Sequence, residues 1–401
     1  MPIRSRRSSR IYSTEDARGL AWRRLPRLVF DFVDGAAGRE TGAARNQASF
    51  DEIMLRPRVM TNVSSQSLTT KLLDRTYDVP FGIAPMGMCN LVCPHADRHM
   101  AKTAHAMNFP VCLSSAGSSS MEDMRSWAGD QAWFQLYFGH STEASLSVVD
   151  RALKAGYGTL VLTVDVPKVS RRLRDLRNGF HVPFTFSARA FWDFALHPRW
   201  SLSTLIAGVP GPRNFPDGSS NGKFDRGASR AGADWEFLKL IRERWPGKLI
   251  VKGVTCPEDA TKICEFGADA IYVSNHGARQ LDSAPPAIQL LPLIRRAVGP
   301  NYPLLFDGGV RNGEDVVKAL ALGADFVMLG RAPLFALGAD NQAGLEALFK
   351  GMAHDIGITL AQIGISKIEN LNNEVIFANA TMSHTAGESR ASIMPPVAVK
   401  S

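Results

Sequence analysis

The chain has 401 residues, of which 45% are hydrophobic and 21% are charged, with 34 glycines and a formal net charge of +8. This composition is typical of a folded protein and excludes a disordered chain, a collagen-like repeat and a small disulfide-bonded scaffold. The length allows two or three domains, or one large (β/α)8 barrel, which typically needs about 250 residues before insertions.

A basic N-terminal segment, residues 1–24, carries part of the positive charge. It contains RSRRSSR at residues 4–10, followed later by Arg23 and Arg24. The simplest interpretation is a solvated tail, and attraction to an anionic membrane surface is the main alternative. We expect no nucleic-acid partner, because no nucleic-acid-binding motif accompanies these charges.

The cysteines indicate a reducing compartment. There are five of them, an odd number without a C-x-x-C pair, and no signal peptide precedes them. We therefore expect a protein that faces the cytoplasm. The longest apolar runs have the length of a strand, far below the roughly 20 residues that a bilayer-spanning helix needs.

Short β-rich runs alternate with helical segments from residue 79 onward. Several runs are almost continuously apolar, as expected for strands that are covered on both faces. Between these runs, apolar residues recur at helical intervals in residues 97–106, 142–153, 257–265 and 313–322. The eight predicted strands are residues 79–86, 109–114, 132–138, 159–163, 248–252, 270–274, 303–306 and 326–329.

A weak internal repeat supports this alternation. Three times a helix is expected to end at a glycine shortly before a strand, at Gly156, Gly267 and Gly323. Eight strand–helix units favour a closed (β/α)8 TIM barrel over an open sheet. We predict that this barrel covers residues 25–380 and that residues 381–401 form a polar C-terminal tail.

One insertion, about residues 170–234, interrupts the regular spacing between the fourth and fifth strands. Its first part, residues 184–211, is rich in aromatic side chains and predicts a helical or amphipathic piece. Its second part, residues 214–232, is rich in Gly and Ser and predicts a mobile loop. A lid over the active site, a contact with a membrane surface and a subunit contact are the three roles considered.

Polar side chains lie at the carboxyl ends of the predicted strands, where a barrel assembles its active site. His276 follows the sixth strand next to Gly277, which favours a general base over a buried core histidine, and Arg279 would hold an anion nearby. Asp165 ends the fourth strand, and its carboxylate would orient the His276 ring and raise its basicity.

Four arginines follow Asp165 in RRLRDLRNGF, residues 171–180. Arg172 is the candidate for a bidentate clamp on a substrate carboxylate. Arg171, Arg174 and Arg177 are expected to be ordinary surface charges.

The loops after the last two predicted strands indicate a phosphate site. Their glycines let backbone N–H groups approach an anion, and two arginines stand at matching strand ends. With a phosphate site there, Lys252 at the end of the fifth strand is interpreted as a charge placed against a cofactor. The residues of this site are Asp307, Gly308, Gly309, Arg311, Gly330 and Arg331.

Together these motifs resemble those of the FMN-dependent 2-hydroxy acid dehydrogenases and oxidases, the family of glycolate oxidase, L-lactate dehydrogenase and mandelate dehydrogenase. The resemblance covers about residues 25–365. It rests on LPRLVFDF, RPRVM, WFQLYF, LTVDVP, RRLRDLRNGF, SNHGARQLD and DGGVRNGEDVVKALALGADFV, which occur in the family's order. In HPRWSL and in residues 234–253 the chain looks most like the membrane-associated mandelate and lactate dehydrogenases.

The resemblance implies FMN at the strand ends. Lys252 would face the N1/C2=O edge of the flavin and stabilise negative charge there. Ser274 would touch the ring or the ribityl chain, and the six residues of the phosphate site would hold ribityl and phosphate. The residues that would contact the ring are Pro85, Met86, Gly87, Ser114, Gln135 and Thr163.

The resemblance also implies a reaction, the oxidation of an L-2-hydroxy acid to the 2-oxo acid. His276 would be the base with Asp165 as its partner, while two electrons pass to flavin N5. Tyr137 would place its hydroxyl near the substrate oxygen, and Arg172 and Arg279 would grip the carboxylate. A quinone, another carrier or O2 would then accept the electrons.

The chain departs from the family's pattern at three places. Phe32 stands where a second active-site Tyr is usual, and the absent hydroxyl could cost about 1–3 kcal/mol of substrate recognition. The substrate is therefore expected to be lactate-like or, because Phe32 is apolar, bulkier and mandelate-like. Met86 and Gly87 replace a usual Thr and Ala, which changes the space beside flavin N5. CNLVCPHADRH, residues 89–99, could suggest a metal site, but the family has an ordinary loop and helix there and we expect no metal.

Two other functions remain alternatives. The chain could be an FMN barrel enzyme that acts on a non-standard substrate by oxidative tailoring or isomerisation, or a non-catalytic flavin-binding, membrane-associated protein. Intact His276, Arg279, Arg172, Tyr137 and Lys252 argue against the second. The resemblance further suggests a homotetramer, located in the cytoplasm and bound peripherally to the inner face of the cell membrane.

Overall fold

The structure is a computed structural model that describes residues 10–180, 187–215 and 230–377. Eight parallel strands close into a barrel in which each strand pairs with the next, and β10 pairs back to β3. The predicted (β/α)8 barrel is confirmed, and no predicted strand end is wrong by more than two residues. The strands are β3 (Phe81–Met86), β4 (Val111–Ser114), β5 (Ala132–Leu136), β6 (Thr159–Thr163), β7 (Lys248–Val254), β8 (Ala270–Val273), β9 (Leu304–Phe306) and β10 (Phe326–Leu329).

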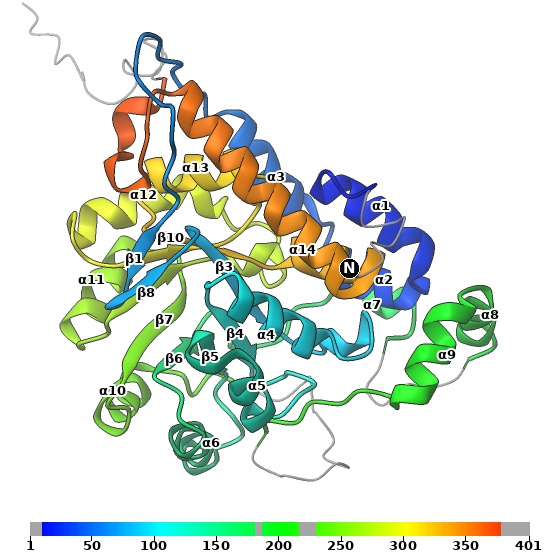
Figure 1. Ribbon diagram of the computed structural model, residues 1–401. Coiled ribbons are helices and arrows are strands. Elements are labelled where there is room, and N and C mark those ends of the chain that lie inside the picture. The colour runs from blue at the N-terminus through cyan, green and yellow to red at the C-terminus, as the bar shows by residue number, and fades with distance from the viewer. Residues whose placement is uncertain (1–9, 181–186, 216–229, 378–401) are drawn as a thin grey trace, which may run out of the picture.

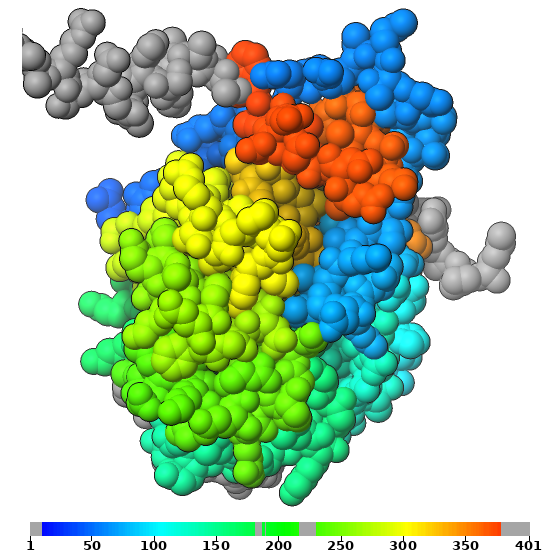
Figure 2. Space-filling model, turned by 90° about the vertical axis from the view of Figure 1, so that its left-hand side faces the viewer, coloured from blue at the N-terminus to red at the C-terminus, as the bar shows by residue number. Residues whose placement is uncertain are grey.

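Helices form the outer layer around the barrel (Figure 1). Figure 2 shows one side of this layer, where green, yellow and orange segments follow one another in chain order. The four helical segments predicted from spacing are confirmed as α4 (Ala96–Ala106), α6 (Thr142–Lys154), α11 (Pro257–Glu265) and α13 (Gly313–Ala321). The other helices are α1 (Thr14–Arg24), α2 (Arg27–Asp34), α3 (Thr41–Asp51), α5 (Met121–Ala128), α7 (Leu173–Arg177), α8 (Ala188–Leu196), α9 (Pro198–Ala207), α10 (Trp235–Arg244), α12 (Ala287–Val298) and α14 (Arg331–Gln362), with 3-10 turns η2 (Cys89–Leu91), η3 (Gly129–Gln131), η4 (His276–Ala278), η5 (Ile368–Asn370) and η6 (Asn373–Val375).

Side chains along each strand alternate between two cores. On β6, Val161 belongs to the interior cluster with Trp133 and Tyr272, whereas Leu160 and Leu162 belong to the cluster packed against the helices. This alternation follows from the two-residue period of a strand. Because both faces are covered, the strands read as continuous apolar runs in the sequence.

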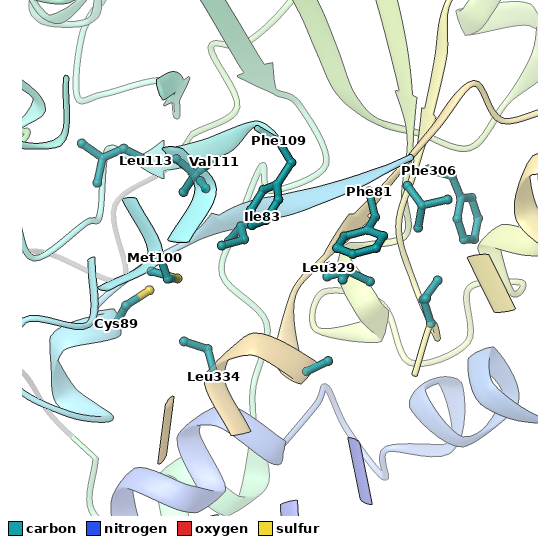
Figure 3. Packing of buried hydrophobic residues seen from close by; sticks show 14 of the residues in the cluster. Phe81, Ile83, Cys89, Met100, Phe109, Val111, Leu113, Phe306, Leu329 and Leu334 are labelled. Carbon is teal, nitrogen blue, oxygen red and sulfur yellow. The ribbon is translucent and has the colours of Figure 1, made fainter. Parts of the chain in front are cut away.

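The outer core joins the strands to the helices. Figure 3 shows Phe81 and Ile83 of β3 facing Met100 of α4 and Leu334 of α14. The predicted helix-ending glycines are confirmed, since Gly156, Gly267 and Gly323 have φ values of 83°, 77° and 110°, which favour glycine. A two-stranded hairpin of β1 (Thr70–Leu72) and β2 (Arg75–Tyr77) closes the amino-terminal end of the barrel, where Tyr77 packs on Phe326.

The helix α1 contradicts the simplest expectation for part of the basic segment. Residues 14–24 are not a solvated tail, because Ala17 and Ala21 are buried and α1 lies against α14. Gly338 of α14 permits this approach, since a Cβ at that position would meet Leu25 at 2.9 Å. Residues 1–9 lie outside the described residues, and the limits of the predicted domains stay a prediction.

The insertion between β6 and β7 contains the predicted helical piece. It forms α8 and α9, which stand out from the side of the barrel in Figure 1. Trp200 of α9 donates from its indole Nε1 to the carbonyl of Leu91 at 2.8 Å and anchors the helix. Most of the expected mobile loop, residues 216–229, lies outside the described residues. Across the described ranges, no helix is both long and apolar enough to cross a bilayer.

Candidate active site

A cavity opens at the carboxyl ends of the barrel strands, as predicted. Five predicted residues do not line it directly, namely Asp165, Ser114, Gln135, Thr163 and Ser274. The predicted residues that do line it are Phe32, Pro85, Met86, Gly87, Tyr137, Arg172, Lys252, His276, Arg279, Asp307, Gly308, Gly309, Arg311, Gly330 and Arg331.

His276 lies between a carboxylate and a phenol. Its Nδ1 is 3.0 Å from Oδ1 of Asp165, and its Nε2 is 3.5 Å from the hydroxyl of Tyr137. Burial would raise the pKa of Asp165, but His276 and Lys252 together outweigh burial and hold that pKa below its usual value. The carboxylate therefore stays charged and orients the imidazole so that Nε2 faces the cavity.

Backbone conformation helps to place this base. His276 has a φ of 56°, in the left-handed region that non-glycine residues seldom adopt. Its backbone N–H donates to Oγ of Ser274 at 3.0 Å, which helps to hold that conformation. Strained residues of this kind concentrate at functional sites because the surrounding structure must hold them.

Ser274 also connects the base to a buried ion pair. Lys252 is 3% exposed, and its Nζ lies 2.7 Å from Oγ of Ser274 and 3.2 Å from Oδ2 of Asp307. Ser274 in turn donates to Asp307. Burial alone would lower the pKa of Lys252, but Asp307 and Asp165 outweigh it and keep the ammonium charged.

Two half-buried arginines, Arg311 and Arg331, lie near each other at the predicted phosphate site. Burial lowers the pKa of Arg331 to about 9, with Arg311 contributing in the same direction, and burial lowers the pKa of Arg311 as well. Gly309 has a φ of 95°, and a Cβ there would lie 2.3 Å from the carbonyl oxygen of Asn46. A cradle that only glycine fits, next to two cations that repel each other, suits a bound phosphate.

Two buried polar atoms lack partners among the residues that the resemblance assigns to the flavin ring. Nε2 of Gln135 and Oγ1 of Thr163 have no hydrogen-bond partner among the described residues, although both side chains are almost fully buried. Buried polar groups normally have partners, so these orphans call for a polar ligand. Oγ of Ser114 meanwhile lies 2.7 Å from Oε1 of Gln135 and fixes the orientation of that amide. The residues present thus fit FMN at both its phosphate and its ring.

Arg279 makes contacts that the sequence did not predict. It lines the cavity, and its guanidinium donates to the carbonyls of Phe32, Val33 and Gly35 at the end of α2. The ring of Phe32 stacks on that of Phe180 with centroids 4.7 Å apart and an interplanar angle of 8°. Arg279 therefore couples α2 to the base loop, and the two rings form an apolar wall of the cavity.

The expectation for Arg174 was wrong. Its side chain is 30% exposed and forms ion pairs with Asp31, Asp34 and Glu40, so it holds α7 against α2. Sequence reading missed this because the three acidic partners are more than 130 residues away. Arg171 and Arg177 are exposed, as predicted.

Sequence reasoning also missed several residues that line the cavity, among them Asn46 and Arg230. Asn46 of α3 exchanges two side-chain hydrogen bonds with Asn275, at 2.9 and 2.8 Å. The signal available in the sequence was its helical spacing from the apolar Ala43 and Phe50, which share its buried face. The guanidinium of Arg230 lies 4.6 Å from the ring centroid of Tyr137. Arg230 belongs to the stretch expected to be a mobile loop, and nothing in its local pattern indicated this contact.

Among the residues that the structure describes, no cluster of three or more His, Cys, Asp and Glu could hold a metal ion.

Comparisons with known proteins agree with this geometry. Residues 21–378 match the model of a family described as FMN-dependent dehydrogenase. The chain is 38% identical to (S)-mandelate dehydrogenase of Pseudomonas putida over 391 residues, 95% of this chain and 99% of that protein. It is 35% identical to an L-lactate dehydrogenase of Pseudomonas syringae pv. syringae, over 91% of this chain and 98% of that protein.

Solved structures give the same result. A crystal structure described as the monotopic membrane protein (S)-mandelate dehydrogenase has a TM-score of 0.87 at 38% identity, over 92% of this chain and 100% of that chain. A crystal structure of mandelate oxidase has a TM-score of 0.78 at 30% identity, over 90% of this chain and 97% of that chain.

The chain belongs to the FMN-dependent dehydrogenase family. It is an FMN-dependent dehydrogenase or oxidase of 2-hydroxy acids, and the comparisons favour neither the tailoring enzyme nor the non-catalytic flavin protein.

Proposed function

We propose that this enzyme oxidises (S)-2-hydroxy acids with an aromatic or bulky apolar side chain, and that His276 is its general base. The observation that carries the proposal is the position of Nε2 of His276, 3.5 Å from the Tyr137 hydroxyl and at the cavity, with Nδ1 held by Asp165. A base held in one tautomer by a carboxylate is the arrangement that proton abstraction needs.

Each polar group near His276 has a role in the proposal. His276 takes up the proton that leaves the substrate, and Asp165 stabilises the imidazolium that results. Tyr137 donates a hydrogen bond to the substrate oxygen. Burial, with Asp165 contributing, raises the pKa of Tyr137, so its phenol remains protonated and able to donate.

The substrate's two ends meet different surfaces. Arg172 and Arg279 both line the cavity and bind the carboxylate by charge-assisted hydrogen bonds. The stacked rings of Phe32 and Phe180 offer an apolar wall without a hydroxyl. An aromatic side chain packs on such a wall, whereas a methyl group leaves most of it uncovered, so a mandelate-like acid is favoured over lactate.

FMN would be held along the strand ends. Arg311, Arg331 and the Gly308–Gly309 cradle would bind its phosphate, with Gly330 nearby, and Asp307 would bind the ribityl chain. Lys252 and Ser274 would lie along one ring edge. When bound, FMN supplies the acceptor for the two electrons of the substrate. The other ring contacts in the proposal are Pro85, Met86, Gly87, Ser114, Gln135 and Thr163.

Anaerobic mixing tests the activity and the substrate class together. The yellow holoenzyme is mixed with aliphatic and aromatic (S)-2-hydroxy acids, and loss of flavin absorbance is followed. We expect fastest bleaching by aromatic acids. Admission of oxygen or a quinone then separates an oxidase from a dehydrogenase. Failure of every 2-hydroxy acid to bleach the bound flavin would contradict the proposal.

The variant His276→Ala tests the base. It should retain FMN and its absorbance, while bleaching slows by about 10²–10⁴-fold, the contribution typical of a positioned general base. A matched control is His140→Ala on the loop before α6, an exposed histidine that does not line the cavity. Normal bleaching in His276→Ala would exclude this assignment.

We also propose that α8 and α9 dock on a membrane surface, with the enzyme in the cytoplasm at the inner face of the cell membrane. Large apolar side chains are exposed there, which is uncommon for a surface in contact only with water. A relative is described as a monotopic membrane protein, which supports the proposal. The exposed residues are Phe191, Trp192, Leu196, Leu202, Leu205, Ile206 and Val209.

Vesicle cosedimentation tests this docking. Wild type and a Phe191→Ser/Trp192→Ser/Leu196→Ser variant are mixed with vesicles of phosphatidylglycerol and phosphatidylcholine. The variant should remain in the supernatant with intact hydroxy-acid activity. The matched control changes exposed apolar residues elsewhere, Val59→Ser/Met60→Ser, and should still sediment. Equal sedimentation of all three proteins would point to the basic N-terminal segment or to no membrane role.

The proposed oligomer is a homotetramer, which follows from the family alone. Light scattering of the holoenzyme at micromolar concentration tests it, and a monomer mass would overturn it.

A further inference from the structure

The insertion between β6 and β7 contributes a cation to the active-site cavity. Arg230 lies shortly before α10, and its side chain lines the cavity together with Tyr137 and Arg172. Its guanidinium lies 4.6 Å from the centroid of the Tyr137 ring, within the range of a cation–π contact. The proposed chemistry gives roles to Tyr137 and Arg172, and none to Arg230.

The backbone around Arg230 is fastened to the barrel. The N–H of Arg230 donates to the carbonyl of Pro167, in the loop after β6, at 3.0 Å. The N–H of Ala233 donates to the carbonyl of Arg230 at 3.3 Å, so residues 230–233 form a turn. Arg230 therefore extends from a turn that hydrogen bonds hold against the end of β6.

Gly232 lets this turn approach the segment that carries Tyr137. A Cβ at Gly232 would lie 2.3 Å from Cζ of Phe138, so a side chain there would push the ring of Phe138 away. Phe138 follows Tyr137 directly and packs edge to face on Phe237 of α10, with ring centroids 4.9 Å apart. The turn, Phe138 and α10 thus pack together next to Tyr137.

Tyr137 is held by three contacts. Its backbone N–H donates to Oγ of Ser115 at 3.0 Å, and its hydroxyl lies 3.5 Å from Nε2 of His276. The guanidinium of Arg230 lies over its ring. A planar cation over an aromatic face favours one orientation of that ring, so the three contacts together direct the hydroxyl toward the base and the substrate oxygen.

The charge of Arg230 also acts on the Tyr137 hydroxyl. Burial and Asp165 raise the pKa of Tyr137, and nearby cations, Arg230 foremost, act in the opposite direction. A cation near a phenol favours negative charge on the phenol oxygen, and that charge increases when the phenol donates to an oxyanion. The charged and titratable side chains around Tyr137 are Asp165, Arg172, Arg230, Lys252 and His276.

We propose that Arg230 is a positioning residue for the oxidation, which holds the Tyr137 ring and strengthens its hydroxyl as a hydrogen-bond donor to the substrate oxygen. Negative charge develops on the substrate as His276 takes up its proton, and a stronger donor stabilises that charge. This inference rests on the proposed hydroxy-acid oxidation. It adds the insertion to the parts of the chain that act in that reaction.

Direct binding of the substrate carboxylate would be a different role for Arg230. The two roles differ in what they need from Tyr137. A cation that acts through the phenol loses its effect when the hydroxyl is absent, whereas a cation that attracts the carboxylate acts equally with Tyr or Phe at this position. The position of the guanidinium over the Tyr137 ring favours the first role, and Arg172 and Arg279 already line the cavity for the carboxylate.

The test is a double-mutant cycle, measured as the rate of flavin reduction in anaerobic stopped-flow with a bleaching hydroxy acid. The cycle contains wild type, Arg230→Met, Tyr137→Phe and the double variant. Arg230→Gln is measured in parallel as a second neutral replacement, and Arg230→Lys restores a cation. The matched control is Arg199→Met, which removes a positive charge from the exposed surface of α9, outside the cavity.

We expect Arg230→Met and Arg230→Gln to retain FMN and to lower the limiting rate of flavin reduction by about threefold to tenfold, the range of a partly buried cation–π contact. The half-saturating substrate concentration should change by less than about twofold, and Arg199→Met should react like wild type within the same margin. Arg230→Lys should recover most of the lost rate, because a lysine ammonium also binds aromatic faces.

The Tyr137→Phe background decides between the two roles. There, Arg230→Met should change the rate by less than about twofold, since the hydroxyl on which it acts is gone. An equal loss in both backgrounds would overturn the proposal and indicate direct binding of the carboxylate. A normal rate for Arg230→Met in the Tyr137 background would overturn it as well.

Fluorine NMR gives a measurement that does not depend on turnover. The holoenzyme is labelled with fluorotyrosine, whose phenol titrates at lower pH than that of tyrosine, and the Tyr137 resonance is identified by its absence from Tyr137→Phe. Loss of a nearby cation raises the pKa of a phenol. We therefore expect this resonance to titrate at higher pH in Arg230→Met than in wild type and in Arg199→Met.

The two measurements distinguish failure of this inference from failure of the proposed function. The same titration in all three proteins would overturn the action of Arg230 on Tyr137, even where the enzyme oxidises hydroxy acids normally. A higher titration in Arg230→Met, without bleaching of the flavin by any hydroxy acid, would support the contact although the substrate assignment had failed.

Discussion

Asp165 and His276 come from two different loops, 111 residues apart, and meet with Oδ1 and Nδ1 at 3.0 Å. Gly253 makes room for this contact. Its φ is 103°, and a Cβ there would lie 2.5 Å from Cβ of Asp165. The pairing of β7 and β8 is irregular between Lys252 and Val254, and this irregularity therefore helps to position Asp165 beside the base His276.

Asp165→Asn should lower the rate of flavin reduction by about 10²–10⁴-fold without loss of FMN, because an amide can stabilise neither the required tautomer nor the imidazolium. The measurement is anaerobic stopped-flow with a bleaching hydroxy acid. Asp150→Asn on α6, which pairs with Arg244 at the surface, is the control and should react normally. A normal rate for Asp165→Asn would mean that the contact is only structural.

The fold was predictable because its strands are covered on both faces. Such strands are continuous apolar runs with turn glycines between them, and this signal is local. The strand ends carried a second local signal, since barrels concentrate polar chemistry there. Hence His276, Lys252, Asp307 and Arg331 could be named from sequence, and the structure brings them to one cavity.

The contacts that sequence could not give are those between distant segments. Arg174 was expected to be a surface charge, but it pairs with Asp34 of α2. Arg230 lies over the ring of Tyr137, although it belongs to a Gly/Ser-rich stretch whose pattern predicts no structure. Helix α1 was not predicted within the basic segment, because its buried face consists of small residues such as Ala17 and Ala21, which give a weak hydrophobic pattern. Neither charge nor periodicity reveals a partner that lies elsewhere in the chain.

The variant Arg331→Gln tests whether the charge of Arg331 serves FMN binding and not the stability of the fold. Burial and Arg311 lower the pKa of Arg331 to about 9, so its charge is costly until a phosphate binds. The variant should therefore bind FMN about 10- to 100-fold more weakly, the loss of one charge-assisted contact. The cofactor-free variant should be as stable as cofactor-free wild type or more so. Flavin fluorescence titration and urea unfolding measure the two effects, and a large loss of stability would contradict this account.

Phe32→Tyr tests how the apolar wall selects the substrate. A hydroxyl on this ring would add a hydrogen-bond donor for the substrate carboxylate, worth about 1 kcal/mol. We expect kcat/KM for lactate to rise by about fivefold to tenfold through KM. Mandelate should gain less, because its ring already uses the Phe32–Phe180 surface. Equal gains for both acids would show that the wall does not discriminate between them.

The Asp34 cluster should make stability depend on pH. Burial would raise the pKa of Asp34, but hydrogen bonds from Arg18 and Arg174 outweigh it and lower that pKa to about 2, from 3.8. Because the folded pKa lies below the unfolded one, the contribution to stability is complete above about pH 4 and is lost as the pH falls toward 2. Its size is about 2 kcal/mol at neutral pH.

Urea unfolding of Asp34→Asn and wild type at several pH values measures this contribution. The variant should be less stable by about 2 kcal/mol at pH 6, and the difference should shrink as the pH falls below 4, because wild type then loses the same charge. Asp130→Asn is the control. Its carboxylate pairs with Arg75 and Arg125 but is 60% exposed, so its loss should cost less than about 1 kcal/mol. A difference for Asp34→Asn that persists unchanged at pH 3 and below would show that packing of the side chain, and not its charge, holds α2 to α7.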